Sequence, residues 1–153
     1  VSEFDLFAKL VLSGRLAMPD LTVVCIDANC RKHDQARKEI ADHTGDFTPE
    51  RVVIACPDPH IERWYMADPK SFALAVGAQP PTPKRKCGRD VYKAALMSTI
   101  RQAGQVAPLG GVEFAPELVE RMELFRAGKN DKSLKVFLDE LGNALVRLSS
   151  PGG

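Results

Sequence analysis

The sequence predicts an α/β domain with a short parallel sheet and a helical C-terminal half. Two runs rich in β-branched residues, LTVVCI (21–26) and RVVIAC (51–56), have the composition of strands that are covered on both faces. The segment between them, HDQARKEIADH (33–43), is polar and favours a helix. A strand, a helix and a strand within about 35 residues form a βαβ unit, whose two strands run parallel.

Length and composition indicate one globular domain. The chain has 153 residues, enough to bury a core without disulfides, so we expect a single domain over 1–150 and a disordered tail at 151–153. The 21 basic and 20 acidic residues nearly cancel, so any binding site for a polyanion must be local. Long apolar runs and CxxC pairs are absent from the sequence, which predicts a soluble cytoplasmic protein with no membrane partner.

Capping residues and helical periodicity predict the remaining elements. The amphipathic segment SEFDLFAKLVL suggests an N-terminal helix. Asp58 and Asp68 each precede a proline, which suits an N-cap and predicts helices that begin at Pro59 and Pro69. Three further helices are expected at 90–103, 116–127 and 131 to about 148, the first two closed by a glycine. The last carries an apolar stripe that should pack on the sheet or on neighbouring helices.

Two acids are expected at one edge of the sheet. Asp27 directly follows the first strand, and Glu62 lies a few residues beyond the second. Ligands of parallel α/β sheets bind at the carboxyl ends of the strands. If strand geometry persists, Asn29 projects to the same side as Asp27, and hard oxygen ligands of this kind suit Mg²⁺ or Mn²⁺. Alternatively, each acid is only a turn or capping residue.

These motifs resemble a known group of proteins. VVCIDANC, followed by PHIERWYMAD, is similar to the Toprim-like families of prokaryotes, in particular the DUF4276 and RloB-related type. A Toprim-like three-layer fold and the chemistry of nucleases of the overcoming-lysogenization-defect type are what the resemblance implies. By resemblance, Asp27, Asn29 and Glu62 are metal ligands, with Asn in place of a second acid. The family's first strand, which ends in a glutamate, would precede Val1.

The resemblance also assigns Lys93, within DVYKAALMSTI, to charge stabilisation on a phosphate. A solvated helix-surface lysine is the alternative. The segment PKRKCGR predicts a nucleic-acid contact in a loop, with further basic residues after Asp27, or else a plain solvated loop. The basic residues in these two segments are Lys84, Arg85, Lys86, Arg89, Arg31 and Lys32.

Other kinds of site have weaker support. Cys30 and His33 have a C-x-x-H spacing, but no second closely spaced ligand pair accompanies them. Trp64 shares an apolar helix face with Ile61 and Tyr65, which favours core packing over base stacking.

With the resemblance, the sequence implies Mg²⁺-dependent phosphodiester chemistry on nucleic acid, in which Asp27, Glu62 and Lys93 would carry the reaction. A prokaryotic defence setting is implied by the resemblance. The alternative is a catalytically inactive Toprim-like module that binds nucleic acid or a partner ATPase, which the asparagine at position 29 favours.

Overall fold

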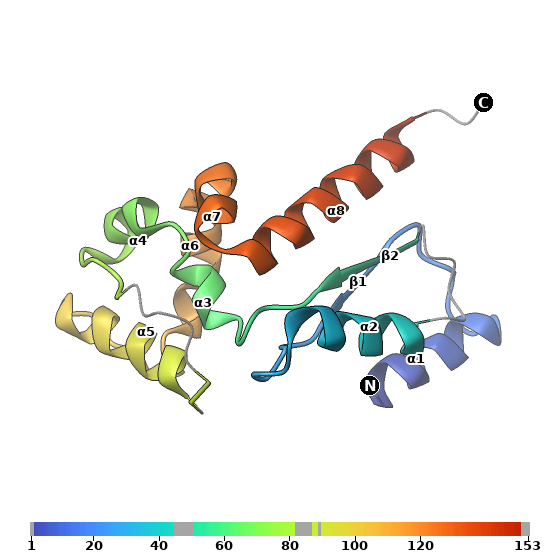
Figure 1. Cartoon of the computed structure of the whole chain (residues 1–153), viewed down its shortest axis with the longest axis horizontal. Helices are drawn as coiled ribbons and strands as arrows, with labels where there is room; N and C mark the ends of the chain where they lie inside the picture. The colour runs from blue at the N-terminus through green and yellow to red at the C-terminus, as the bar shows by residue number, and fades with distance from the viewer. Residues whose placement is uncertain (1, 45–50, 82–86, 89, 151–153) are drawn as a thin grey trace.

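The computed structural model describes residues 2–44, 51–81, 87–88 and 90–150, and it confirms a mixed α/β architecture (Figure 1). Helix α1 (Ser2–Leu12) leads into the βαβ unit. Its strands, β1 (Thr22–Cys25) and β2 (Val52–Ala55), pair in parallel, and α2 (His33–His43) connects them.

The chain beyond β2 is helical, as expected. Its elements are α3 (Glu62–Tyr65), α4 (Pro69–Val76), α5 (Val91–Gln102), a 3-10 turn at Val112–Phe114, α6 (Ala115–Arg121), α7 (Leu124–Asn130) and α8 (Lys132–Ser149). Gly77 ends α4 with a left-handed φ of 88°, and the carboxylate of Asp131 caps α8. Figure 1 shows α8 running from α7 past β2. Within the described ranges, no helix has the length and apolarity to cross a membrane.

The helix predicted over 116–127 is wrong, because the chain breaks there into α6 and α7. Met122 is extended, with ψ at 128°, and the Glu123 carboxylate caps two amides of the first turn of α7. The amide of Glu123 in turn donates to Asp68 Oδ2 at 3.0 Å. Gly128, expected to end the helix, lies inside α7. The break involves Asp68, which is far from Glu123 in the sequence. The helical periodicity of residues 116–127 therefore gives no sign of it.

The helix predicted to begin at Pro59 is also wrong. The peptide bond from Asp58 to Pro59 is cis, and α3 begins three residues later at Glu62. The carbonyl of Asp58 accepts a hydrogen bond from Arg63 Nη1 at 2.8 Å. Glu62 is therefore the first residue of a short helix and not its fourth.

The sheet is covered on both faces at β2 only. Val24 and Ile54 are opposite each other and pack with α2 on one face. On the other face Val53 is 2% exposed, whereas its partner Val23 is 48% exposed. The difference arises because α8 packs against β2. The prediction that both strands are covered on both faces is thus confirmed for β2 and wrong for β1.

The C-terminal stripe of α8 is only partly buried. Leu134 is buried and packs beside Ala55 of β2, and Phe137 and Leu138 join the same cluster. Leu145 and Leu148, nearer the end of α8, are about half exposed, at 50% and 49%. The predicted packing of the stripe holds for the first part of the helix.

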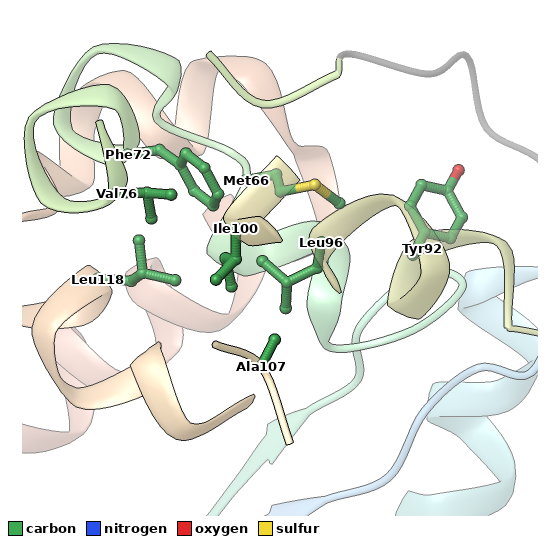
Figure 2. Close-up of a cluster of buried hydrophobic side chains, with 8 residues drawn as sticks. All are labelled: Met66, Phe72, Val76, Tyr92, Leu96, Ile100, Ala107 and Leu118. Carbon is green, nitrogen blue, oxygen red and sulfur yellow. The ribbon is translucent and has the colours of Figure 1, made fainter. Parts of the chain in front are cut away.

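The largest cluster of buried side chains lies among α3 to α6. Figure 2 shows its members: Met66, Phe72, Val76, Tyr92, Leu96, Ile100, Ala107 and Leu118. Full burial of a large apolar side chain contributes about 1.5–3 kcal/mol. Helix α5 supplies three of the large side chains, so it is the centre of this half of the molecule.

An ion pair joins α4 to α7 beside this cluster. Asp68 is 1% exposed and accepts from Arg126 Nε and Nη2 at 2.6 and 2.7 Å. The bonds from Arg126 hold the pKa of the Asp68 carboxyl far below its usual range. Two parallel bonds fix both the distance and the orientation of the two helices.

We expect Gly111→Ala to destabilise the fold by about 2–4 kcal/mol. Gly111 has a φ of 96°, and an added Cβ would lie 2.7 Å from Ile100 Cδ1 and 2.8 Å from Leu96 Cγ. The cost combines left-handed strain with overpacking. Urea unfolding measures it. The matched control is Gly142→Ala in α8, where nothing lies within 4 Å of the added Cβ and a gain of about 0.5–1 kcal/mol is expected. Equal effects of the two changes would contradict the packing described here.

Candidate functional site

Asp27 lies at the carboxyl edge of the sheet, as predicted. The parallel ladder continues past β1, because Ile26 donates to the Ala55 carbonyl at 3.0 Å and Ala28 to the Pro57 carbonyl at 2.9 Å. The segment that contains Asp27 therefore runs beside the chain leaving β2. The Asp27 side chain is 29% exposed, and its Oδ2 lies 3.3 Å from Nδ1 of His60. The Asp27 carboxylate thus contacts His60, in the segment that follows β2, and it is still partly exposed to water.

Glu62 is brought to the same region through Tyr65. Burial raises the pKa of Tyr65, and the nearby charges of Cys25, Glu62 and Asp27 raise it further. Glu62 begins α3, two residues after His60, whose ring lies beside the Asp27 carboxylate. Both carboxylates thus disfavour ionisation of the same half-buried phenol.

A buried polar network holds α3 in position. Ser133 Oγ accepts from Trp64 Nε1 at 2.8 Å and from the Asp58 amide at 3.2 Å. The same hydroxyl donates to Asp131 Oδ1 at 2.6 Å. Arg63 Nε lies 3.0 Å from the other oxygen of that carboxylate. These contacts join both ends of the β2–α3 connection to the start of α8, so they determine where Glu62 lies.

Trp64 is a core residue, as predicted. It is 6% exposed, and its ring stacks on Phe137 with centroids 5.3 Å apart. Ile61 packs in the same cluster. Tyr65, which the sequence placed on this face, packs partly against the cluster of Met66, Phe72 and Tyr92 instead.

The extended geometry assumed to persist from Asp27 to Asn29 is wrong at Asn29. Asn29 has a φ of 50° and Cys30 a φ of 66°, so both residues are left-handed. The side-chain amide of Asn29 donates from Nδ2 to the backbone carbonyl of Asp27 at 3.4 Å. The backbone N–H of Asn29 donates to the Pro59 carbonyl at 3.1 Å, which is the last backbone hydrogen bond between the two segments. The chain turns away from the sheet at this point. The Asn29 side-chain oxygen is still a possible ligand, although strand geometry does not direct it.

The predicted basic residues are dispersed. Lys93 is exposed on α5, and its aliphatic stem lies against Gly110, where an added Cβ would be 2.6 Å from Cε. Arg31 pairs with Glu39 and donates from Nε to the Ala28 carbonyl at 3.1 Å. Lys32 precedes α2 and is exposed. None of the contacts found for Lys93 reaches Asp27 or Glu62 in the described part of the chain.

Four residues predicted to contact nucleic acid lie outside the described residues. These are Lys84, Arg85, Lys86 and Arg89. Residues 151–153, predicted as a tail, also lie outside them.

The donor set at the edge suits a hard cation with water ligands. Two carboxylates and one amide oxygen are the ligand types that Mg²⁺ and Mn²⁺ prefer, and Mg²⁺ commonly takes only one or two carboxylates from a protein. Over the described ranges, no three His, Cys, Asp or Glu side chains gather into a metal-binding group. Any metal here would therefore complete its coordination with water or with substrate oxygens.

The nearby Cys56 does not supply a nucleophile. It is 1% exposed, and burial is the main cause that raises its pKa to about 11. The thiol is protonated at neutral pH, and only a thiolate attacks or binds metal readily.

Sequence reasoning missed His60 and the phenol of Tyr65. Both lie within the segment PHIERWY, two residues before and three residues after Glu62. Both residues could have been found from their place in a short connection after a parallel strand, because polar groups there tend to reach the carboxyl edge of the sheet. No family model, curated protein or solved structure matches the chain.

We expect Glu62→Gln to lower the pKa of Tyr65 towards the ordinary value of about 10. Removing a negative charge makes the phenolate easier to form, so the titration moves to lower pH. Absorbance of the phenolate, taken as the difference from a Tyr65→Phe protein, measures this pKa. Asp27→Asn should act in the same direction. Asp139→Asn is the control, because Asp139 pairs with Lys135 on α8 and does not act on Tyr65. An unchanged pKa in both site variants would show that the acids do not face Tyr65.

Proposed function

We propose that this chain carries out Mg²⁺- or Mn²⁺-dependent phosphodiester chemistry on nucleic acid. The observation that carries the proposal is the position of Asp27 at the carboxyl edge of a parallel sheet, where its carboxylate meets His60 of the segment that leads from β2 to Glu62. Acids brought to such an edge from two neighbouring strands are a common basis for a ligand site. The resemblance of VVCIDANC and PHIERWYMAD to Toprim-like proteins supports the same chemistry.

Asp27 and Glu62 would hold the metal, with the Asn29 side-chain oxygen as a third ligand. A bound divalent cation supplies charge stabilisation to a phosphate and lowers the pKa of a bound water. His60 lies 3.3 Å from Asp27 Oδ2, which leaves the second oxygen of that carboxylate for a ligand. The imidazole would fix the orientation of the carboxylate.

Tyr65 has a separate role in this proposal. Its phenol is a hydrogen-bond donor on the helix that begins with Glu62, and burial raises its pKa further above neutral. Such a donor would bind a phosphate oxygen.

Binding of the nucleic-acid backbone would use basic residues around this edge. Lys32 is exposed and follows the Asp27 turn, and Lys84, Arg85, Lys86 and Arg89 belong to the predicted basic loop. Each lysine or arginine that contacts a phosphate increases the salt dependence of binding. Lys93 stays a proposed phosphate contact in this scheme.

The test is cleavage of end-labelled single- and double-stranded DNA and RNA with Mg²⁺, with Mn²⁺ or with EDTA. Metal-dependent cleavage should fall by more than about 100-fold in Glu62→Gln and Asp27→Asn, since loss of even an outer-shell partner of a metal costs 10–100-fold. Asp139→Asn, which removes a carboxylate on α8, should cleave like the wild type.

Fluorescence anisotropy in EDTA separates binding from cleavage. Binding without cleavage in any metal would replace the proposal with the inactive module. The departure at Asn29, which lacks the charge of a second acid, favours that second candidate. Cleavage that persists in both site variants would contradict the assignment of Asp27 and Glu62.

A further inference from the structure

Two cysteines that are far apart in the sequence meet near the carboxyl edge of the sheet. Cys30 lies in the turn that follows Asp27, and Cys87 lies shortly before α5. The sulfur of Cys87 is 3.9 Å from the backbone carbonyl oxygen of Cys30, although 57 residues separate them in the chain. Neither cysteine is a ligand in the proposed metal site. The pair is thus a separate chemical feature of the molecule.

Both cysteines are reduced and accessible to solvent. Cys87 is exposed and Cys30 is partly exposed. An oxidant can therefore contact both residues, which is the first condition for cysteine oxidation. The other two cysteines are arranged differently. Cys56 is buried with Val24 on the α2 face of the sheet, whereas Cys25 follows Val24 in β1 and projects from the opposite face.

Backbone hydrogen bonds hold the two segments that carry the pair. On one side, the amide of Arg31 donates to the Ala28 carbonyl at 3.1 Å across the turn. On the other side, the amide of Val91, the first residue of α5, donates to the Gly88 carbonyl at 3.3 Å. The contact between the cysteines therefore joins the edge of the sheet to the helix at the centre of the other half.

The backbone is left-handed on both sides of the contact. Cys30 has a φ of 66°, and Asp90, three residues after Cys87, has a φ of 60°. This conformation is unfavourable for residues other than glycine, and such residues are concentrated at functional sites. The unusual geometry at Cys30 is a second observation that singles out this position.

The contact is close enough for a disulfide to form with little movement. Within one cysteine the carbonyl oxygen and the sulfur are only a few bonds apart, so rotation about the Cα–Cβ bond of Cys30 can bring its sulfur to that of Cys87. Disulfides join cysteines whose Cα atoms are about 4.4–6.8 Å apart. A sulfur that already touches the backbone of the other cysteine satisfies most of this requirement.

We propose that Cys30 and Cys87 form a redox site, which a peroxide oxidises to an intramolecular disulfide. The thiolate of Cys87, the more exposed residue, attacks one oxygen of hydrogen peroxide. The O–O bond breaks, which gives a sulfenic acid and hydroxide. The thiolate of Cys30 then attacks the sulfenic sulfur, the S–O bond breaks, and the second oxygen leaves as hydroxide. Overall, the two thiols lose two electrons to the peroxide, and two molecules of water and a disulfide are formed.

The disulfide ties the turn that follows Asp27 to the start of α5. Disulfides in a reducing compartment are usually transient and serve in redox sensing. A dithiol reverses the bond by thiol–disulfide exchange. The inference does not depend on the proposed function, because the redox step uses neither the metal ligands nor a nucleic acid.

The test is oxidation of the dilute, folded protein with hydrogen peroxide, followed by alkylation of the remaining thiols and peptide mass mapping. The main product should be a monomer lighter by about 2 Da, with Cys30 linked to Cys87, and dithiothreitol should restore both thiols. A main product that links Cys25 or Cys56, that joins two molecules, or that carries Cys87 as a sulfinic acid without a link would overturn the proposal.

Variants identify the two thiols that are responsible. Cys30→Ser and Cys87→Ser should each abolish the intramolecular link. Cys87 is exposed, so its substitution keeps the test valid if Cys30→Ser fails to fold. Cys25→Ser is the matched control, since Cys25 is also exposed and its loss should leave the link unchanged. A link that persists in Cys87→Ser would contradict the assignment.

Oxidation in urea distinguishes folded geometry from chance encounters. An unfolded chain closes short loops more readily than long ones, so Cys25 should replace Cys87 as the main partner of Cys30. An equal preference for Cys87 in urea would show that the fold does not bring the two thiols together. Metal-dependent cleavage is measured in dithiothreitol, so its absence would remove the phosphodiester chemistry and leave the redox site.

Discussion

The hydroxyl of Ser133 is the contact on which the arrangement of the two halves depends. It receives hydrogen bonds from the Trp64 indole and the Asp58 amide, and it donates to Asp131, all within a largely buried region. Hydrogen bonds of this kind are worth about 0.5–1.5 kcal/mol each, but leaving one partner unsatisfied costs about 1–3 kcal/mol. Because the strand exit, α3 and α8 all meet at this atom, a shift in any one of them would break the network.

This constraint explains how the segment that leaves so small a sheet is held in place. Two parallel strands alone do not bury both faces, and Val23 of β1 is exposed. Helix α8 covers β2 and is fixed at its start by the Asp131 cap and the Ser133 network. The segment that leaves β2 is therefore held by α8 as well as by the sheet. As a result, Glu62 has a defined position. The ion pair of Asp68 and Arg126 similarly holds the start of α4 against α7.

Much of the fold could be predicted from the sequence, because its signals are local. Strand composition located β1 and β2, and the Asp-Pro and glycine boundaries located α4 and α5. The break between α6 and α7 could not be predicted, since it depends on Asp68 accepting from the Glu123 amide across the chain. The exposed face of β1 was missed for a similar reason, as the path of α8 is a tertiary feature.

The candidate site was only partly predictable. The rule about carboxyl ends of parallel strands placed Asp27 at the sheet edge, beside the segment that leads from β2 to Glu62. The positions of His60 and Tyr65 were missed because they depend on tertiary contacts of the segment that leaves β2, such as those of Ser133 with the Asp58 amide and Trp64. The turn at Asn29 was missed because strand geometry was assumed to continue past Asp27, although asparagine adopts the left-handed region more readily than most residues. Lys93 lies against Gly110, a contact between distant segments that no helical pattern contains.

The central claim is that Asp27 and Glu62 form one metal-binding edge. The most direct measurement is paramagnetic broadening of backbone amide resonances by substoichiometric Mn²⁺. The account predicts broadening concentrated at residues 25–29 and 60–65 that is lost in Glu62→Gln. Broadening centred on other carboxylates, or an unchanged pattern in Glu62→Gln, would contradict it.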